Sequence, residues 1–261
     1  MQARAKGRYE LKYVVPPECA RAAAAFVKPY CDPDPFLEGA PEYTISSLYL
    51  DTRDLAFYRA KRVHQKDRVK ARVRTYGPLS EGPVFLELKR RTGDVIMKTR
   101  VQVPRERWVD LATATGPLPT LPLRPHKIRV IDDFRAHVLG LSLRPVVTVR
   151  YEREPYVGRT DPGVRVTFDR RMRYAPATTF EIAAADRDFL PFDHSGMFSP
   201  GDGSLLVMEI KFDEHYPVWV PELIRRIDVA RVSFSKYCNA VDPILSRGWT
   251  YDPGRLVPVT V

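Results

Sequence analysis

The sequence has little cysteine, and the cysteines that it has are far apart. Only Cys19, Cys31 and Cys238 occur, and they form no Cys-x-x-Cys pair. This pattern excludes a disulfide framework and a cysteine zinc site as organising features, and indicates buried or incidental thiols. The 5 histidines show no metal-ligand spacing, and no serine lies in a nucleophile-elbow context. We therefore predict neither histidine nor serine catalysis.

Long apolar runs are also missing. No stretch reaches the about 18 uninterrupted apolar residues of a membrane helix, and no apolar run follows the basic N-terminal residues. We predict no transmembrane segment and expect a cytoplasmic protein. Because fixed-period repeats and low-complexity linkers are absent as well, residues 1–261 are predicted to form a single domain.

The charges are abundant and unbalanced. The chain has 42 Lys and Arg against 32 Asp and Glu, a formal net charge of +10. A surplus of this size predicts an anionic partner, and charge alone leaves nucleic acid, an acidic membrane surface and a polyanionic small molecule open.

Several predicted strands alternate strictly between charged and apolar residues. In the segment Val69–Arg74, the side chains of Lys70, Arg72 and Arg74 point to one face and the small apolar ones to the other. The same alternation recurs in the segments 85–89, 97–100 and 207–211. A single strand of this kind is ordinary for an antiparallel sheet with one wet face, so what matters is whether the charged faces meet.

The chain is predicted to be an α+β protein. We expect strands at residues 8–15, 43–50, 66–76, 84–91, 94–103, 144–153, 163–169 and 205–212. We expect helices at residues 18–25, 104–112, 127–139, 220–229 and 235–240, and a short one ending near residue 61 that Asp51 or Thr52 caps. About eight mostly antiparallel strands suit a closed β-barrel.

The charge pattern predicts which face of that barrel is which. Val69, Ala71 and Val73 are too small to fill a lumen, and the amphipathic helices need an apolar surface to cover. We therefore expect helices outside and charges in the lumen, which makes the barrel a tunnel. Because desolvating an unpaired ion costs several kcal/mol, an excess of lumenal cations predicts a bound anion.

Six segments, taken in order, form a recognisable pattern: Arg8–Tyr13, Ser47–Thr52, Val69–Arg74, Leu86–Lys89, Val149–Tyr151 and Met208–Lys211. Together they resemble the VTC domain. This domain is the catalytic module of eukaryotic vacuolar polyphosphate polymerase, occurs in many bacterial proteins, and belongs to the triphosphate tunnel metalloenzyme (CYTH-like) superfamily. The resemblance runs from about residue 8 to 242 and is to a stand-alone bacterial form of the domain. It implies a tunnel lined with charged side chains.

The resemblance implies roles for individual residues. The cations expected to hold the triphosphate or the product phosphates are Lys12, Arg72, Arg74, Lys89, Arg150 and Arg165. Further substrate-binding residues are Arg8, Glu10, Lys70, Lys98, Arg100, Lys211 and Lys236. Glu209 is expected to bind Mn²⁺ or Mg²⁺ through hard carboxylate oxygens. Glu87 is expected either to support that ion or to balance neighbouring cations.

The implied activity is transfer of the γ-phosphate of ATP to a growing polyphosphate chain, with release of ADP. Hydrolytic members of the superfamily typically begin with Glu-x-Glu-x-Lys, whereas this chain has Arg8-Tyr9-Glu10-Leu11-Lys12. Arginine in place of the first carboxylate removes a metal ligand and favours phosphoryl transfer. A triphosphatase and a non-catalytic polyphosphate sensor remain as alternatives. Nucleic acid is disfavoured as a partner, and a membrane-associated partner is left open.

Overall fold

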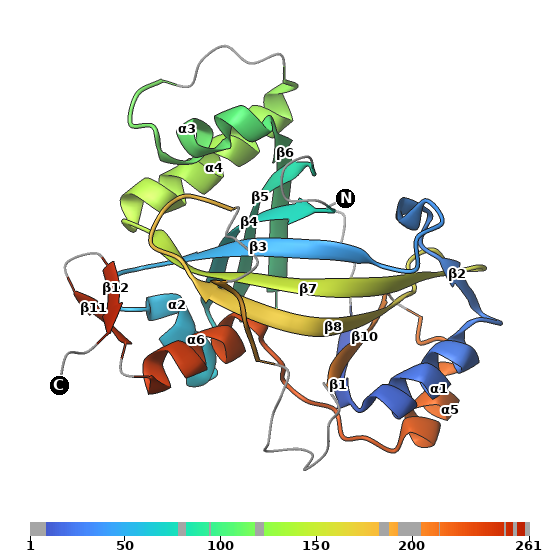
Figure 1. Ribbon diagram of the computed structural model, residues 1–261. Helices are drawn as coiled ribbons and strands as arrows, with labels where there is room; N and C mark the ends of the chain where they lie inside the picture. The colour runs from blue at the N-terminus through green and yellow to red at the C-terminus, as the bar shows by residue number, and fades with distance from the viewer. Residues whose placement is uncertain are drawn as a thin grey trace. The chain divides into compact units, whose positions relative to one another are not determined.

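The computed structural model describes residues 9–77, 82–93, 95–117, 123–182, 188–192, 205–213, 215–247, 249–252 and 255–258 (Figure 1). The chain divides into two compact units. The first comprises Met1–Thr44, Tyr151–Met172 and Pro191–Ser235, and the second Ile45–Arg150, Arg173–Leu190 and Lys236–Val261.

The first unit is an antiparallel sheet with two helices on one face. β1 (Tyr9–Val15) pairs with β10 (Leu206–Phe212), and β10 pairs with β8 (Arg165–Pro176). The short β2 (Cys31–Pro33) pairs with the end of β7 (Arg144–Gly158), and β9 (Leu190–Pro191) pairs with β8. The helices are α1 (Pro17–Val27) and α5 (Val220–Ile227), and η1 (Pro35–Leu37) is one 3₁₀ turn.

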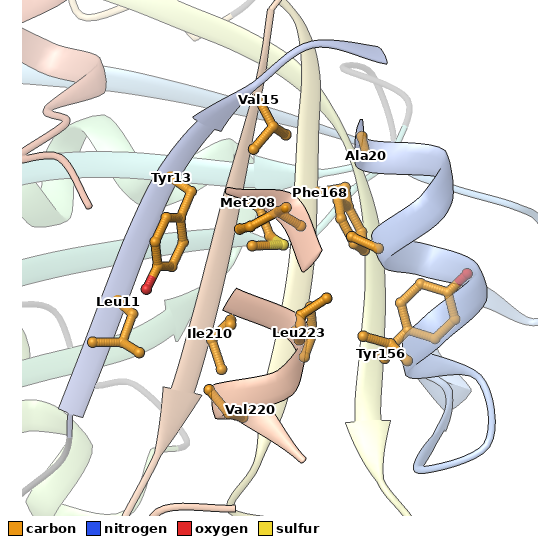
Figure 2. Close-up of a cluster of buried hydrophobic side chains, with 14 of the residues drawn as sticks. Leu11, Tyr13, Val15, Ala20, Tyr156, Phe168, Met208, Ile210, Val220 and Leu223 are labelled. Atoms are coloured by element: carbon orange, nitrogen blue, oxygen red, sulfur yellow. The ribbon is translucent and has the colours of Figure 1, made fainter. Parts of the chain in front are cut away.

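One face of this sheet forms the hydrophobic core of the first unit. Leu11, Tyr13 and Val15 of β1 point to this face and pack with Met208 and Ile210 of β10, as Figure 2 shows. α1 and α5 cover this face with Ala20, Ala23, Val27, Val220, Leu223 and Ile227. Because neighbouring strand residues point to opposite faces, Glu10, Lys12, Arg165, Glu209 and Lys211 lie on the other side of the sheet.

The second unit is a four-stranded antiparallel meander with further helices. β3 (Tyr43–Asp51), β4 (Arg68–Tyr76), β5 (Val84–Thr92) and β6 (Val95–Val103) pair in this order, and the first half of β7 follows β3 on the other side. The helices are α2 (Ala56–Arg62), η2 (Arg105–Arg107), α3 (Trp108–Thr113), α4 (Pro125–Gly140) and α6 (Lys236–Ser246). β11 (Trp249–Asp252) and β12 (Arg255–Pro258) form a separate hairpin.

The core of the second unit lies between the apolar face of the meander and two helices. Ala71, Val73, Leu86, Leu88 and Val101 are buried there. They pack against α3 and α4 through Trp108, Leu111, Ile131, Phe134 and Val138. α3 and α4 lie against β5 and β6 (Figure 1). The predicted arrangement, with helices over the small apolar residues and charges on the opposite face, is thus confirmed for this unit.

The expected secondary structure agrees with the observed elements, with shifted ends. The chain has mixed helices and antiparallel strands as predicted, and six α-helices are present among the described residues. β7 and β8 are longer than expected, ending at Gly158 and Pro176 rather than near residues 153 and 169. Closure into a barrel is not shown by the strand pairings, so the closed tunnel and the single domain stay predictions.

Leu55, and not Asp51 or Thr52 as predicted, is the N-cap residue of α2, but both predicted side chains bind N–H groups of its first turn. Asp51 accepts hydrogen bonds from the backbone N–H groups of Phe57 and Tyr58, each at 2.9 Å. The Thr52 hydroxyl accepts one from the N–H of Ala56, also at 2.9 Å. These side chains satisfy donors in the first turn that have no partner within the helix.

Candidate functional site

The charged face of β4, β5 and β6 in the meander carries many cations and one carboxylate. The register places Arg72 opposite Glu87, and Glu87 opposite Arg100, so these three side chains share a face. Lys70, Lys89 and Lys98 are aligned in the next row, and Arg74 lies at the other end beside Phe85. We name this set the cationic face. It comprises Lys70, Arg72, Arg74, Lys89, Lys98 and Arg100 with Glu87.

Glu87 is at the centre of the cationic face and is buried, with 2% of its surface exposed. Its Oε2 accepts hydrogen bonds from Arg72, at 2.7 Å from Nε and 2.6 Å from Nη2. Its Oε1 lies 3.2 Å from Arg100 Nε and 3.5 Å from Lys98 Nζ. Glu87 thus neutralises part of the positive charge of the cationic face. Of the two roles predicted for it, this arrangement fits the balancing of neighbouring cations.

The surplus of positive charge shifts the pKa values of several groups. Burial raises the pKa of Glu87, but Arg72, Arg74 and Lys98 outweigh burial and hold this pKa far below its usual value. Burial, together with the neighbouring arginines, lowers the pKa of Lys98 to about 8. Burial raises the pKa of Tyr49, but Arg72 and Arg74 outweigh it and lower this pKa to about 8. All three shifts have the direction that a strongly positive environment produces.

Side chains of β3 hold the two central arginines in place. Arg74 Nε donates to Ser47 Oγ at 3.0 Å, and Arg72 Nη1 donates to the Tyr49 hydroxyl at 3.2 Å. The Tyr49 ring stacks on the Tyr237 ring of α6, with centroids 5.1 Å apart.

A buried carboxylate extends this support to α6. Tyr237 donates its hydroxyl to Asp51 Oδ2 at 2.6 Å, and Asp51 has none of its surface exposed. Burial raises the pKa of Asp51, against the lowering effect of its hydrogen bonds. Sequence reasoning predicted Asp51 only as a cap and missed Tyr49 and Tyr237, because the contact between β3 and α6 is not visible in the order of residues.

Arg150 lies away from the cationic face. Its Nε donates to Ser46 at 3.2 Å, and its guanidinium carbon is 4.0 Å from the Phe189 ring centroid. Ser46 and Ser47 are successive residues of a strand, so they direct Arg150 and Arg74 to opposite faces of β3. These surroundings do not favour the predicted phosphate-binding role. Lys236, the first residue of α6, is buried.

The charged face of the first unit is organised around Glu209. This carboxylate is buried, and its Oε1 accepts from Lys12 Nζ at 2.9 Å while its Oε2 accepts from Lys211 Nζ at 2.6 Å. Glu10 lies 3.3 Å from Lys12 and 3.5 Å from Lys211. Burial lowers the pKa of Lys211, and the charge of Arg153 adds to this effect, whereas Glu209 raises the pKa but does not outweigh them. Four predicted site residues are therefore brought together.

Arg153 and Asp169 join this group and were missed from the sequence. Arg153 donates to Asp169 through two bonds of 2.6 and 2.8 Å, and its Nη2 lies 3.8 Å from Glu209 Oε2. Burial lowers the pKa of Arg153, but Asp169 outweighs it and holds this pKa well above its usual value. Arg165 shares the register row of Lys211, is half exposed, and lies 3.6 Å from Asp34.

The carboxylates of the first unit fit a divalent ion only in part. Among the described residues, no three Asp, Glu, His or Cys side chains gather as a metal cage. Glu209 and Glu10 can each offer one hard oxygen ligand, and Mg²⁺ is commonly held by one or two carboxylates plus substrate phosphates. The donor set therefore fits an ion that shares its coordination with phosphate.

The comparison with known families decides which family the chain belongs to. The VTC domain matches residues 7–244, nearly the whole chain. The chain belongs to the VTC domain family. No curated protein matches this VTC domain. No helix among the described residues is long and apolar enough to cross a membrane.

Solved structures of other proteins are similar to this VTC domain at low identity. A protein from Pyrococcus horikoshii OT3 is 14% identical, with a TM-score of 0.46 over 91% of this chain and 99% of its own. A protein from Bacillus halodurans described as a "putative adenylate cyclase" is 13% identical, with a TM-score of 0.46 over 88% of this chain and 95% of its own. A protein of the same description from Vibrio parahaemolyticus is 12% identical, with a TM-score of 0.46 over 92% and 99%.

The predicted site of the VTC domain thus falls into two described groups. The cationic face contains seven of the predicted residues, and the Glu209 group contains Glu10, Lys12, Glu209 and Lys211. Arg8 lies outside the described residues. The functional roles of all these residues stay predictions.

Proposed function

We propose that this VTC domain is a metal-dependent phosphotransferase that moves the γ-phosphoryl group of ATP onto a growing inorganic polyphosphate chain and releases ADP. The observation that carries the proposal is the cationic face, which sets six cations against the single carboxylate of Glu87. A face with this surplus favours a ligand with several negative charges in a row, as a triphosphate or a polyphosphate has.

The types of cation on this face suit phosphate. Arg72 and Arg74 offer planar forks of N–H donors that match phosphate oxygens, and Lys70, Lys89 and Lys98 add concentrated charge. Tyr49 and Ser47 fix the two arginines before a ligand arrives, which reduces the entropy lost on binding. In our proposal these cations stabilise the charge on the γ-phosphoryl group and the leaving diphosphate.

The Glu209 group is proposed to hold the divalent ion, Mn²⁺ or Mg²⁺. When bound, the ion would supply charge neutralisation to the phosphate oxygens that it shares. Lys12, Lys211 and Arg153 would keep Glu209 ionised and oriented. The attacking group is the terminal phosphate of the chain, which is already anionic at neutral pH, so no protein nucleophile is required. We expect the sheet to close as a tunnel around these phosphates, in a cytoplasmic protein.

Product analysis tests the proposed activity. The purified protein is incubated with ATP and Mn²⁺, and the products are resolved by gel electrophoresis and by phosphate release. We expect ADP and long phosphate chains. Free phosphate without polymer would make the protein a triphosphatase, and binding of tripolyphosphate without either product would make it a sensor. An Arg74→Met variant should lose tripolyphosphate affinity, whereas Arg159→Met, which removes an exposed partner of Asp32, should not.

A further inference from the structure

Four large apolar side chains are exposed at one end of the second unit. They are Val63 after α2, with 74% of its surface exposed, and Val95, Ile96 and Met97 at the start of β6, with 54%, 51% and 47%. Single exposed apolar residues are ordinary, but a contiguous group indicates an interaction surface. We name these four residues the hairpin tip.

The two segments of the hairpin tip lie together. Val63 begins the connection that leads to β4, and Asp67 in this connection accepts a hydrogen bond from Gly93 N at 2.9 Å. Gly93 lies in the turn between β5 and β6, where Arg91 Nε donates to its carbonyl at 2.7 Å. The turn that precedes Val95 is therefore bound to the segment that follows Val63.

Apolar side chains of the hairpin tip point to both sides of β6. Val95 and Met97 are on one face of the strand and Ile96 is on the other, because strand side chains alternate. A protein groove or an added strand would cover one side and leave the other exposed. A lipid interface surrounds an inserted hairpin and contacts both sides.

Exposed cations lie next to the hairpin tip in the segment that contains Val63. Arg62 and Lys66 flank Val63 and are exposed, and Arg62 is 3.6 Å from Asp242. Asp67 is held by the bond to Gly93 described above. Apolar residues that insert, together with flanking basic residues, are the combination that binds anionic lipid surfaces.

We propose that the hairpin tip binds a membrane surface that carries anionic lipid headgroups. This surface adjoins the cationic face, because Ile96 lies on the same side of β6 one row beyond Lys98. The proposed membrane binding goes beyond phosphoryl transfer. It would hold the protein at the bilayer through Val63, Val95, Ile96 and Met97, with Arg62 and Lys66 at the headgroups. The segments involved bind reversibly and do not span the bilayer.

Vesicle co-sedimentation tests this proposal. The full chain is mixed with phosphatidylcholine vesicles, with or without about 30% phosphatidylserine. We expect binding only with phosphatidylserine, and at least about a tenfold loss of affinity in a Val63→Ser/Val95→Ser/Met97→Ser variant. The matched control, Leu139→Ser/Leu141→Ser, changes exposed apolar residues of α4 and the residue after it, and should bind as wild type.

Each other result overturns the proposal. Equal binding to both vesicle types would remove the role of charge, and undiminished binding by the triple variant would assign vesicle binding to the cationic face instead. If light scattering shows a dimer for wild type and a monomer for the triple variant, the hairpin tip is a contact between two copies of the chain. If the triple variant does not fold, Lys66→Glu at an exposed position provides the test, and it should also lower affinity for phosphatidylserine vesicles.

Discussion

Replacing Glu87 by Gln tests whether the cationic face needs a counter-charge. The change keeps the size of the side chain and removes the one carboxylate in the register of this face. A neutral amide then replaces the carboxylate that Arg72 contacts at 2.6 and 2.7 Å and that Lys98 and Arg100 contact at 3.5 and 3.2 Å. Because Glu87 is only 2% exposed, the surrounding charge is poorly screened by solvent.

The magnitude follows from the burial of this group. Removing one partner of a buried ion pair costs about 3–5 kcal/mol. At the lower value, and with about 2–4 °C per kcal/mol for a chain of this size, the melting temperature should fall by roughly 6–12 °C. The control Asp133→Asn removes the partly exposed pair with Arg90, where about 0–1 kcal/mol is expected.

The dependence of stability on pH and on tripolyphosphate distinguishes the lost charge of Glu87 from a simple loss of packing. The folded-state pKa of Glu87 lies below its ordinary value of 4.5, so its stabilisation is present above the unfolded pKa and is lost as the pH falls through the folded pKa. At neutral pH, tripolyphosphate at a hundredfold excess over Kd should add about 2.7 kcal/mol to wild type, and the same concentration should add more to Glu87→Gln.

Thermal unfolding with and without tripolyphosphate measures both effects. A Glu87→Gln protein as stable as wild type would refute the idea that the face is held together by its counter-charge. A smaller tripolyphosphate shift in the variant than in wild type would refute the idea that a polyanion takes the place of that charge.

Four further outcomes follow from the geometry of the cationic face and of the Glu209 group. Tripolyphosphate affinity should fall as the pH rises through about 8, because Lys98 loses its proton and Tyr49 becomes negative there; titration calorimetry should show a weaker fall in both Lys98→Arg and Tyr49→Phe. Since Lys98 has a folded pKa below its ordinary 10.5, its titration adds stability as the pH rises from about 8 to 10.5. Glu209→Ala should abolish metal-dependent turnover and retain tripolyphosphate binding, and a fully active variant would remove Glu209 from the site. Arg153→Met should lower the unfolding free energy by about 3–5 kcal/mol, because it leaves Asp169 buried without this partner; chemical denaturation that shows less than about 1 kcal/mol would contradict this.

The cationic face could be predicted because one physical rule fixes it. In β4, a strict alternation with one apolar face leaves a single register in which Val73 and Ala71 are buried, and a slip of one residue would bury Arg72 and Arg74 against α3 and α4. The helices that cover the apolar face were predictable for the same reason.

Arg153 could not be chosen from the sequence in the same way. Arg150 and Arg153 are three positions apart in one strand, so their side chains point to opposite faces. Tyr-Glu-Arg-Glu has charges at three successive positions, which hides the alternation that identified β4. Asp169 was the last residue of a predicted strand, and its role as the partner of Arg153 depends on the neighbouring position of β7 and β8, which the order of residues does not reveal.

The two charged faces differ in what a ligand must displace. On the cationic face, Glu87 neutralises only part of the charge, so a polyanion can bind without removing a carboxylate. In the Glu209 group, the carboxylates of Glu10 and Glu209 already hold Lys12 and Lys211. A divalent ion at Glu209 competes with Lys12 and Lys211 for the carboxylate oxygens and repels both ammonium groups, and a lysine that gives up its contact is then available to a phosphate. Metal and phosphate binding should therefore support each other in the Glu209 group, whereas the cationic face should bind phosphate without metal.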